Sequence, residues 1–457
     1  MTTVNARPPI DWKAVDEEVV THLRNLLRLD TRNPPGNEII AAQYLKDILE
    51  AEGFECVVIG PSPERATLIT RLKGNGSEQP LLLMGHTDVV AVEPQKWSHP
   101  PFSGDIADGF IYGRGALDMK STVAMELMTI LLLKRHGVPL QRDVIYMAEA
   151  DEETGGHEGA QWVVEHYPEL IQAEYALNEG GGDGMEINGK IYYNVEVAEK
   201  GSARFKIRGS GEPGHGSIPH ENNAIIRLAE LLSKVRGKQP PVHFTATLRG
   251  HIEGLASAQP PELAAQLLAV LDDEATASAA IDSLPVAEHL KLTLHAMAHN
   301  TIAPTMLQAG SQINVIPSEA VAYLDSRLLP GQTLESYLRE LYAIFGEDCA
   351  IEFIDPSLPL EADPASPLFE VIKDVLREYA PEATVIPTML TGGTDAKHVS
   401  RLGTRVYGFS PELYNGSAAW SGVHGHDERV GVQALQWGMR VMYEVVERFA
   451  GQTRSVE

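Results

Sequence analysis

The sequence has 457 residues, enough for two or three domains and a large core, because domains usually contain roughly 100 to 200 residues. Hydrophobic residues make up 43% of it and charged residues 22%, a composition typical of globular proteins. The formal net charge of −26 argues against nucleic acid or an anionic membrane surface as a partner, because both repel an acidic protein.

Cysteine usage and apolar runs exclude two further classes. Cys56 and Cys349 are too few for a disulfide framework or a cysteine metal site. The N-terminus lacks the basic and apolar regions of a signal peptide. The longest apolar run, Val123 to Leu133, is too short to span a bilayer. We therefore expect a cytoplasmic protein without a membrane partner.

The first part of the chain predicts helices and the strands of a sheet. Apolar residues recur at helical spacing over Val15–Leu29 and Glu38–Gly53, which the breaker-rich TRNPPGN separates. A long loop at Trp97–Gly115 precedes a third helix, Ser121–Arg135. Short apolar runs bounded by Gly, Pro or polar residues predict the strands, which are Cys56–Ile59, Ala66–Leu72, Leu81–Met84, Val144–Ala148 and Tyr175–Leu177.

Polar residues follow the third of these strands. His86 and Asp88 share one face, because residues i and i+2 of a strand point the same way. A histidine beside a carboxylate suits a metal ligand that a second acid holds in one tautomer. A merely solvated strand end explains the pair about equally well.

Carboxylates gather at the ends of the next two strands. Four lie within five residues, namely Glu149, Asp151, Glu152 and Glu153, and Glu179 follows the next strand. Adjacent carboxylates repel one another unless a cation compensates, so the cluster favours a bound cation. Open α/β sheets place ligands at the carboxyl edge of their strands, where we expect these residues to meet His86.

Asp118 lies in GRGALDMK, just before the helix predicted from Ser121. An N-terminal helix cap is the common use of an Asp in this position. The alternative is a carboxylate projected toward His86, with Gly113 and Gly115 letting the backbone approach closely.

After Lys200 the pattern is that of a smaller α+β domain with an antiparallel sheet backed by two helices. The predicted strands are Ala203–Arg208, Lys291–Met297, Gln308–Val315, Ala320–Arg327 and Ala350–Ile354. The predicted helices are Asn223–Arg236 and Leu334–Phe345, with further helices for packing or assembly within Val242–Ala287. The chain then returns to α/β character with helices at Leu368–Tyr379 and Val432–Phe449.

Five motifs, MGHTDVV, GRGALDMK, EADEETGG, NEGG and HGHDE, resemble in order and spacing those of the di-zinc M20 metallopeptidases. That family includes aminoacylases, carboxypeptidases and dipeptidases. The resemblance implies an α/β catalytic domain, 1–198 with 361–457, whose mixed central sheet is flanked by helices. It also implies an inserted α+β lid or dimerisation domain, 199–360, with a four-stranded antiparallel sheet, two or more helices and a helical insertion at about 243–287.

The resemblance also implies a function for each motif residue. His86 and Glu179 would bind one zinc, Glu153 and His424 the other, with Asp118 bridging, Asp88 as the acid behind His86 and Glu152 as general base. His424 matches better than His426 because it stands four residues before Glu428. Imidazole and carboxylate without thiolate suit two Zn²⁺ ions per chain, or Co²⁺ or Mn²⁺.

Four residues resemble the family's substrate-binding residues: His215 in GHGS, Asn300 in HNTIAPT and Arg327 in LDSRLLPG of the inserted domain, and Gly393 in TGGTDAK beyond it. An Arg fork suits a free carboxylate. A salt bridge to Asp325 is the alternative for Arg327, and a turn is the alternative for His215. The resemblance allows a homodimer and leaves open whether His215 acts in its own chain or across to a partner.

The leading hypothesis is zinc-dependent hydrolysis of the amide bond preceding a free carboxylate, which releases an amino acid from an N-acyl amino acid or short peptide. The NEGGG form and the large insertion look more like the aminoacylase and carboxypeptidase S branch. A dipeptidase and a non-catalytic, metal-stabilised binding protein are the alternatives. A serine hydrolase is disfavoured because no GxSxG motif is present.

Overall fold

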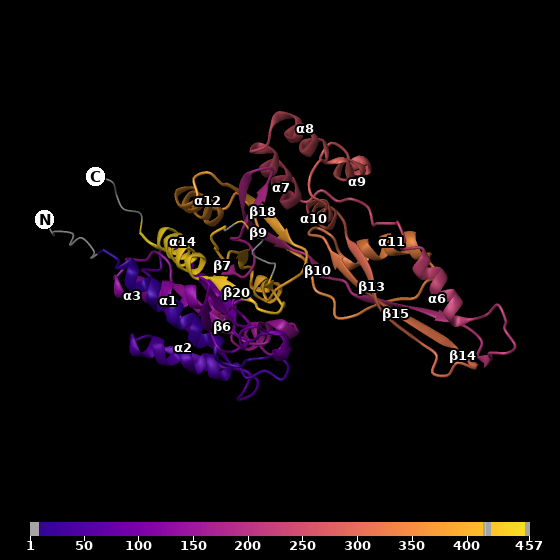
Figure 1. The fold of residues 1–457 in the computed structure, drawn as a ribbon, viewed down its shortest axis with the longest axis horizontal. Coiled ribbons are helices and arrows are strands. Elements are labelled where there is room, and N and C mark those ends of the chain that lie inside the picture. The colour runs from indigo at the N-terminus through magenta and orange to yellow at the C-terminus, as the bar shows by residue number, and fades with distance from the viewer. Residues whose placement is uncertain (1–8, 415, 417–421, 453–457) are drawn as a thin grey trace. The chain divides into compact units, whose positions relative to one another are not determined.

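The computed structural model describes residues 9–414, 416 and 422–452 (Figure 1). The chain divides into two compact units. Unit 1 comprises Met1–Val197, Ala362–Pro387 and Thr394–Glu457, and unit 2 comprises Ala198–Glu361 and Thr388–Gly393.

A mixed sheet forms the centre of unit 1, as expected. Its strands lie in the order β1-β2-β6-β3-β7-β19-β9, and β8 and β18 also pair with β9. β6, β3, β7 and β19 run parallel, whereas β1 and β2 are antiparallel to their neighbours. The strands are β1 (Cys56–Ile59), β2 (Thr67–Leu72), β3 (Leu81–His86), β6 (Val144–Glu149), β7 (Tyr175–Asn178), β8 (Gly184–Ile187), β9 (Lys190–Glu199), β18 (Thr384–Leu390) and β19 (Arg405–Gly408). β17 (Leu360–Glu361) pairs with the last two residues of β9.

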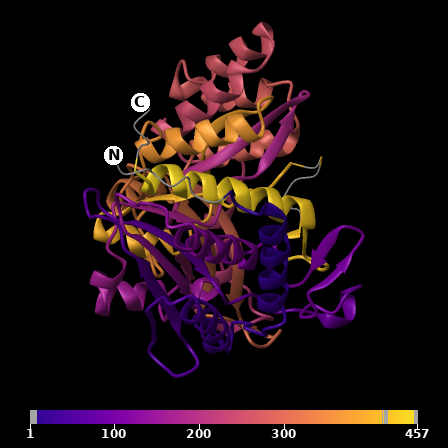
Figure 2. The same cartoon turned by 90° about the vertical axis from the view of Figure 1, so that its left-hand side faces the viewer.

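Helices pack against this sheet and against one another. α3 (Lys120–Arg135) lies on β3 and β6, and α2 (Ile39–Ala51) lies on β1 and β2. α14 (Val432–Ala450), yellow in Figure 2, packs against α3, α12 (Pro367–Tyr379) and the indigo helix α1 (Trp12–Leu27). The short helices are α4 (Ala160–His166), α5 (Pro168–Ile171) and α13 (Ala396–Val399). Because α3 is buried from Lys120 to Leu133, it is a central element of the core.

The segment Trp97–Gly115, predicted to be a loop, contains a β-hairpin. β4 (Asp105–Ala107) pairs with β5 (Phe110–Tyr112), and β20 (Arg429–Gly431) adds a third strand. The strands are only three residues long and lie among Gly, Pro and Asp, so the turn signals concealed them.

Unit 2 contains an antiparallel sheet of five strands rather than the expected four. Its order is β10-β15-β11-β16, and β13 pairs with β15. The strands are β10 (Gly201–Ser202), β11 (Phe205–Ser210), β13 (Thr301–Ala309), β15 (Glu319–Leu328) and β16 (Ile351–Phe353). The additional strand, β10, has two residues, too few for a sequence pattern. α6 (Ala224–Ser233) and α11 (Leu334–Phe345) contribute to the core around Phe205.

Two predicted strands of unit 2 were wrong. Lys291–Met297 lies within helix α10 (Glu288–Ala298). The strand predicted at Gln308–Val315 begins earlier, since β13 ends at Ala309 and a separate short strand, β14 (Val315–Ile316), pairs with β12 (Gly214–His215).

The segment Val242–Ala287 is helical, as predicted. It forms α7 (Ala246–Ser257), α8 (Pro261–Ala269) and α9 (Glu274–Ser283), which pack in sequence, and α10 packs on α7 and α9 (Figure 1). In the part of the chain that the structure describes, no helix has the length and apolarity needed to cross a membrane.

Candidate functional site

Three parallel strands of unit 1 bring the candidate residues to one sheet edge. β6, β3 and β7 are neighbours, and Leu81 of β3 is in register with Val144 and Tyr175. Because parallel strands end at the same edge, His86 meets the residues after β6 and β7 there. Glu152 and Glu153 follow β6 in a 3₁₀ turn (Glu152–Thr154), and Glu179 follows β7.

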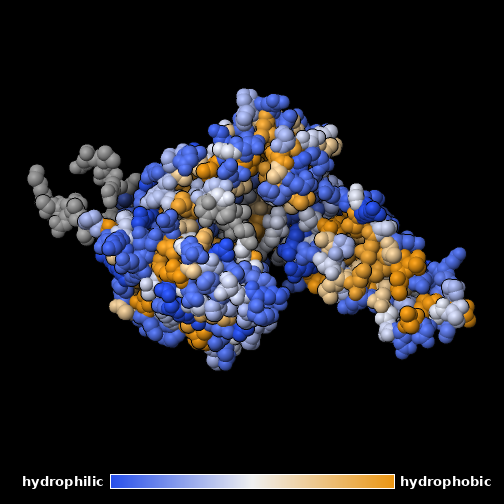
Figure 3. Space-filling view, in the orientation of Figure 1, coloured by the Kyte–Doolittle hydropathy of each residue, from blue (hydrophilic) through white to orange (hydrophobic). Residues whose placement is uncertain are grey.

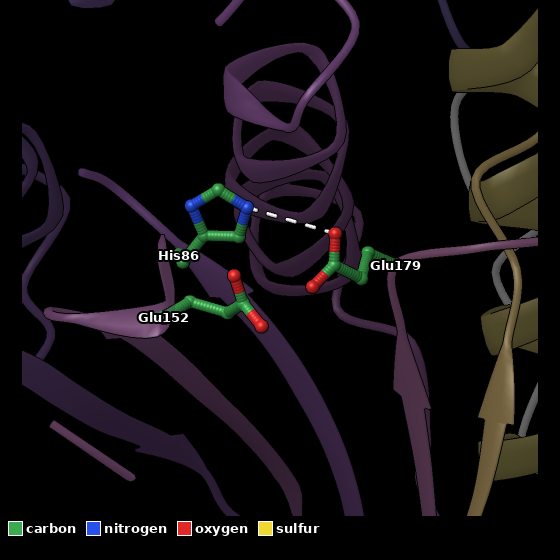
Figure 4. Close-up of side chains that lie close together, drawn as sticks. All are labelled: His86, Glu152 and Glu179. Carbon is green, nitrogen blue, oxygen red and sulfur yellow. Dashed lines mark ion pairs between the residues drawn. The ribbon is translucent and has the colours of Figure 1, made fainter. Parts of the chain in front are cut away.

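His86 is buried and faces carboxylates with one ring nitrogen. Its Nε2 lies 2.9 Å from Oδ1 of Asp118 and 3.6 Å from Oε2 of Glu179. Figure 4 shows His86, Glu152 and Glu179 converging. Nδ1 donates to the backbone carbonyl of Asp88 at 3.0 Å, whereas the Asp88 carboxylate is 3.5 Å away. Nδ1 therefore carries the proton, and Nε2 is oriented toward the acidic cluster.

Asp118 lies between two histidines. Its second oxygen, Oδ2, is 3.1 Å from Nε2 of His424. Its carboxylate does not cap the following helix, because the helix starts at Lys120, and Met119 is the N-cap residue and makes no side-chain capping bond. The capping alternative is therefore wrong, and the carboxylate projects toward His86.

Glu153 and His424 complete the second side of the cluster. Oε2 of Glu153 lies 3.2 Å from Nε2 of His424. Oε1 of Glu153 is buried, and within the described residues it has no hydrogen-bond partner. His426, the weaker candidate, is exposed and pairs with Glu93 at 3.1 Å. The structure thus brings His424, and not His426, to the cluster.

Two overlapping sets have the spacing of a metal site. Ligand atoms of His86, Glu152 and Glu179 lie within 4.8 Å of one another, as do those of His86, Asp118 and Glu153. The donor set of imidazole and carboxylate fits divalent zinc, cobalt or manganese. The unpaired oxygen of Glu153 also fits, because a buried carboxylate oxygen normally has a partner. The cluster is therefore a candidate metal centre.

The acidic groups of the cluster perturb one another. Burial raises the pKa of Glu179 to about 7. Burial and then the charge of Glu179 raise the pKa of Glu152 well above its ordinary value. The hydrogen bonds that His424 donates to the carboxylates of Asp118 and Glu153 raise its pKa to about 10. Crowded carboxylates of this kind bind cations, because a positive charge removes their mutual repulsion.

Asp88 connects two turns rather than binding the cluster directly. Its Oδ1 and Oδ2 each accept a hydrogen bond at 3.2 Å, from the backbone nitrogens of Glu152 and Glu153. The turn after β3 is thus fixed to the turn after β6.

Glu428 and Asn33 are neighbours of the site that the sequence did not assign. The buried carboxylate of Glu428 accepts from the backbone nitrogens of Leu117 and Asp118, at 2.8 and 3.2 Å. Asn33 contacts Asp88. The spacing of Glu428 from His424 was noted, but residues 310 or more apart give no sequence signal of contact.

The four residues expected to bind substrate lie in unit 2, away from this cluster in the chain. His215 is exposed in β12 and its ring bonds Ser217. Asn300 is buried between Glu340 and the backbone of Leu329. Arg327 pairs with Asp325 at 2.9 Å, which was the alternative to substrate binding. Gly393 lies in the segment Thr388–Gly393.

Comparisons with known proteins show the family of the chain. The profile of peptidase family M20/M25/M40 matches residues 82–448. The chain is 30% identical to the N-fatty-acyl-amino acid synthase/hydrolase PM20D1 of Bos taurus, over 82% of this chain and 75% of that protein. It is 26% identical to aminoacylase-1 of Sus scrofa, over 94% of this chain and 95% of that protein.

Solved structures show the same fold. An M20 family metallo-carboxypeptidase from Sulfolobus solfataricus superposes with a TM-score of 0.67 and 20% identity, covering 94% of this chain and 98% of that one. A dinuclear metal-binding peptidase of the M20 family from Bacillus subtilis superposes with a TM-score of 0.60 and 13% identity, covering 96% and 99%.

Proposed function

Since the chain belongs to peptidase family M20/M25/M40 and is a metallohydrolase, we propose that it hydrolyses the amide bond preceding a free carboxylate. The substrate would be an N-acyl amino acid or a short peptide. Hydrolysis would release an amino acid and the carboxylic acid that was joined to its nitrogen. One observation carries the proposal: Glu152, a carboxylate able to act as general base, shares one cluster with His86 and Glu179.

The cluster offers ligands for two cations, which we propose are zinc ions. His86 with Glu179 would hold one and Glu153 with His424 the other, and Asp118 suits a bridge because its two oxygens face the two histidines. Cobalt or manganese fits the same ligands. Bound there, such cations supply Lewis acidity, which polarises the amide carbonyl and lowers the pKa of water.

Glu152 supplies the proton transfers. Burial and the charge of Glu179 raise the pKa of Glu152, which makes its carboxylate a stronger base than an exposed one. It would take the proton from the attacking water and give it to the departing amine. Asp88 holds the backbone of this turn at the nitrogen of Glu152, which keeps the carboxylate at the cluster.

A small cavity beside Asp118 and Glu179 supports the dipeptidase alternative. Its described lining consists of Leu117, Asp118, Met119, Glu179, Gly180, Gly181, Asp183, Ser410, Glu412 and Val423, and contains no Lys or Arg. Burial and the charge of Asp183 raise the pKa of Glu412 to about 7. Such a lining favours a substrate that brings an ammonium group, as a dipeptide does, over one with an apolar acyl chain.

We also propose that His215, Asn300, Arg327 and Gly393 of unit 2 bind the substrate, with unit 2 acting as a lid. For Arg327 this requires the exchange of its Asp325 partner for the substrate carboxylate. The cytoplasmic location of the protein stays a prediction.

The surface of unit 2 supports a homodimer. Seven residues of β13 are exposed in a row, including Met306 and Leu307, and among the described strands only β15 pairs with it. Ile225 and Ile226 of α6 are also exposed, and Figure 3 shows apolar surface gathered over this region. Leu307→Lys should therefore convert a dimer into a monomer in sedimentation experiments. An unchanged sedimentation coefficient would contradict a dimer interface at β13.

The deciding experiment measures amino-acid release from a panel of N-acyl amino acids and dipeptides, using chelated protein with and without zinc. Zinc-dependent release supports the hydrolase. Glu412→Gln should lower kcat/KM for dipeptides relative to their N-acetyl derivatives, which separates the two substrate classes. Two bound zinc ions without release of any amino acid would favour the non-catalytic binding protein instead.

A further inference from the structure

The segment before α2 reaches the candidate metal centre through Asn33. Residues 31–33 run alongside the turn after β3: the backbone nitrogen of Asn33 donates to Val89 at 2.9 Å, and that of Val89 donates to Thr31 at 3.1 Å. Asn33 is 5% exposed. This backbone pairing fixes the position of its side chain beside Asp88.

The side-chain amide of Asn33 connects both turns of the centre. Nδ2 lies 2.9 Å from Oδ2 of Asp88, on the β3 side. It lies 3.0 Å from Oδ1 of Asp151 and 3.0 Å from Oγ1 of Thr154, on the β6 side. The amide has two hydrogens for three acceptors, so all its donor capacity is used on these two turns.

Arg65 fixes the orientation of that amide. Its Nη1 donates to Oδ1 of Asn33 and to the carbonyl of Pro35, each at 3.0 Å, and its Nη2 pairs with Asp151. Because Oδ1 accepts from a guanidinium, Nδ2 must face the carboxylates. Gly36 makes room for this arrangement, since a Cβ there would lie 1.7 Å from Nη1.

The two carboxylates that Asn33 joins both affect the backbone position of Glu152. Asp88 accepts the backbone nitrogen of Glu152. Asp151 precedes Glu152 in the chain and adopts a left-handed conformation, with φ of 74°. Neighbouring carboxylates repel each other unless a donor lies between them, and the Asn33 amide lies between these two.

We propose that Asn33 is a positioning residue for Glu152: its amide holds Asp88 and Asp151 together, so that the turn Glu152–Thr154 keeps its place relative to His86. The inference rests on the proposed function of Glu152 as general base. Asn33 does not contact the substrate or the cations, and acts through these two carboxylates.

The test compares Asn33→Ala with Asn37→Ala. Asn37 lies in the same segment and is half-buried, and none of the side-chain hydrogen bonds of the described residues involves it, so it is a matched control. Loss of a residue that orients such a site lowers activity by about 10- to 100-fold. We expect that loss in kcat for Asn33→Ala at temperatures where the variant is folded, with KM close to that of Asn37→Ala and with metal content unchanged. The melting temperature should fall below that of Asn37→Ala, because the buried partners of the amide lose a hydrogen bond.

A kcat within about twofold of the control would overturn the proposal, as would a loss that saturating metal restores, because then only metal affinity changed. Asn33→Asp has the same shape and serves if the alanine variant does not fold. A protonated carboxyl donates one hydrogen bond, so the activity of this variant relative to the native chain should rise as the pH falls. A pH-independent ratio would contradict the inference.

If the native chain hydrolyses no member of the substrate panel, the proposed function fails, and cobalt spectra then decide the inference separately. Asn33→Ala should change the visible spectrum of the cobalt-loaded protein at equal stoichiometry, because Glu153 belongs to the same turn as Glu152. A spectrum identical to that of Asn37→Ala would overturn it.

Discussion

Glu428 fixes the loop that carries Asp118. We expect Glu428→Gln to lower both the free energy of unfolding and the affinity for metal. The fully buried carboxylate accepts from the backbone nitrogens of Gly115, Leu117 and Asp118, at 3.1, 2.8 and 3.2 Å. It also pairs with Arg114, which is 2% exposed, at 2.5 Å. Four donors therefore converge on one side chain.

The substitution keeps the shape of the side chain but removes its charge and turns one acceptor into a donor. A hydrogen bond to a charged group is worth about 1.5 to 3 kcal/mol, and a buried donor left unpaired costs about 1 to 3 kcal/mol. Breaking a buried ion pair costs about 3 to 5 kcal/mol. We expect the free energy of unfolding to fall by about 3 to 4 kcal/mol, and metal affinity to fall about 10-fold or more as Asp118 shifts.

The assay is urea unfolding followed by far-UV circular dichroism, combined with zinc titration. Glu93→Gln is the control, because Glu93 is exposed and its partners Lys96 and His426 are exposed as well, so its unfolding curve should match that of the native chain. If Glu428→Gln were no less stable than this control and bound zinc equally well, the idea that the charge of Glu428 organises the loop would be refuted.

Three further predictions concern the base, the pH dependence and the backbone. Glu152→Gln should retain the bound metal and lose about 10²- to 10⁴-fold in kcat, and loss of metal from this variant would make Glu152 a ligand instead. Burial lowers the pKa of Lys200 to about 7, below its value of about 10.4 in unfolded chains. The unfolded state then binds more protons between these values, so stability should rise from about pH 7 to pH 10, and Lys200→Met should flatten the rise in urea unfolding. Gly36 and Gly76 both have positive φ, of 82° and 75°, but only at Gly36 would a Cβ collide, with Arg65. Gly76→Ala should cost about 1 kcal/mol and Gly36→Ala clearly more, and equal costs would show that Arg65 moves aside freely.

Local signals predicted most helices correctly. Leu334–Phe345 was predicted with the bounds of α11, whose apolar residues recur at helical spacing. In the structure a capping box of Thr333 and Ser336 begins this helix. Lys291–Met297 was wrong because Leu290, Leu292 and Leu294 alternate like a strand. In the helix, Leu290 and Leu294 are buried and Leu292 is 62% exposed. The buried leucines are thus four residues apart, which is the spacing of one helix face and not of a strand.

The start of β13 was missed because Pro304 indicates a break. The strand continues through it, with a shift in register between Pro304 and Met306, and its exposed edge removes the need for a hydrogen-bond donor at the proline. A bulge of this kind depends on the neighbouring strand, so it leaves no reliable local signal.

Strand ends predicted which side chains meet at the candidate centre, since parallel neighbours deliver their carboxyl ends to one edge. The supporting contacts were beyond the sequence. Asn33 meets Asp151 across 118 residues and Arg114 meets Glu428 across 314, and only the folded chain brings such pairs together. The functions assigned to the cluster residues stay predictions until they are tested.

The sequence separation of Asp118 and His424 has a consequence for biosynthesis. Unit 2 is encoded between them, so a ribosome must complete the whole insertion before His424 emerges. Until then the nascent chain carries crowded acidic groups without one of their two histidine partners, and Arg114 without Glu428. Cation loading is therefore expected to follow synthesis of unit 2 and His424, and contacts this distant in sequence favour slow assembly of the complete cluster.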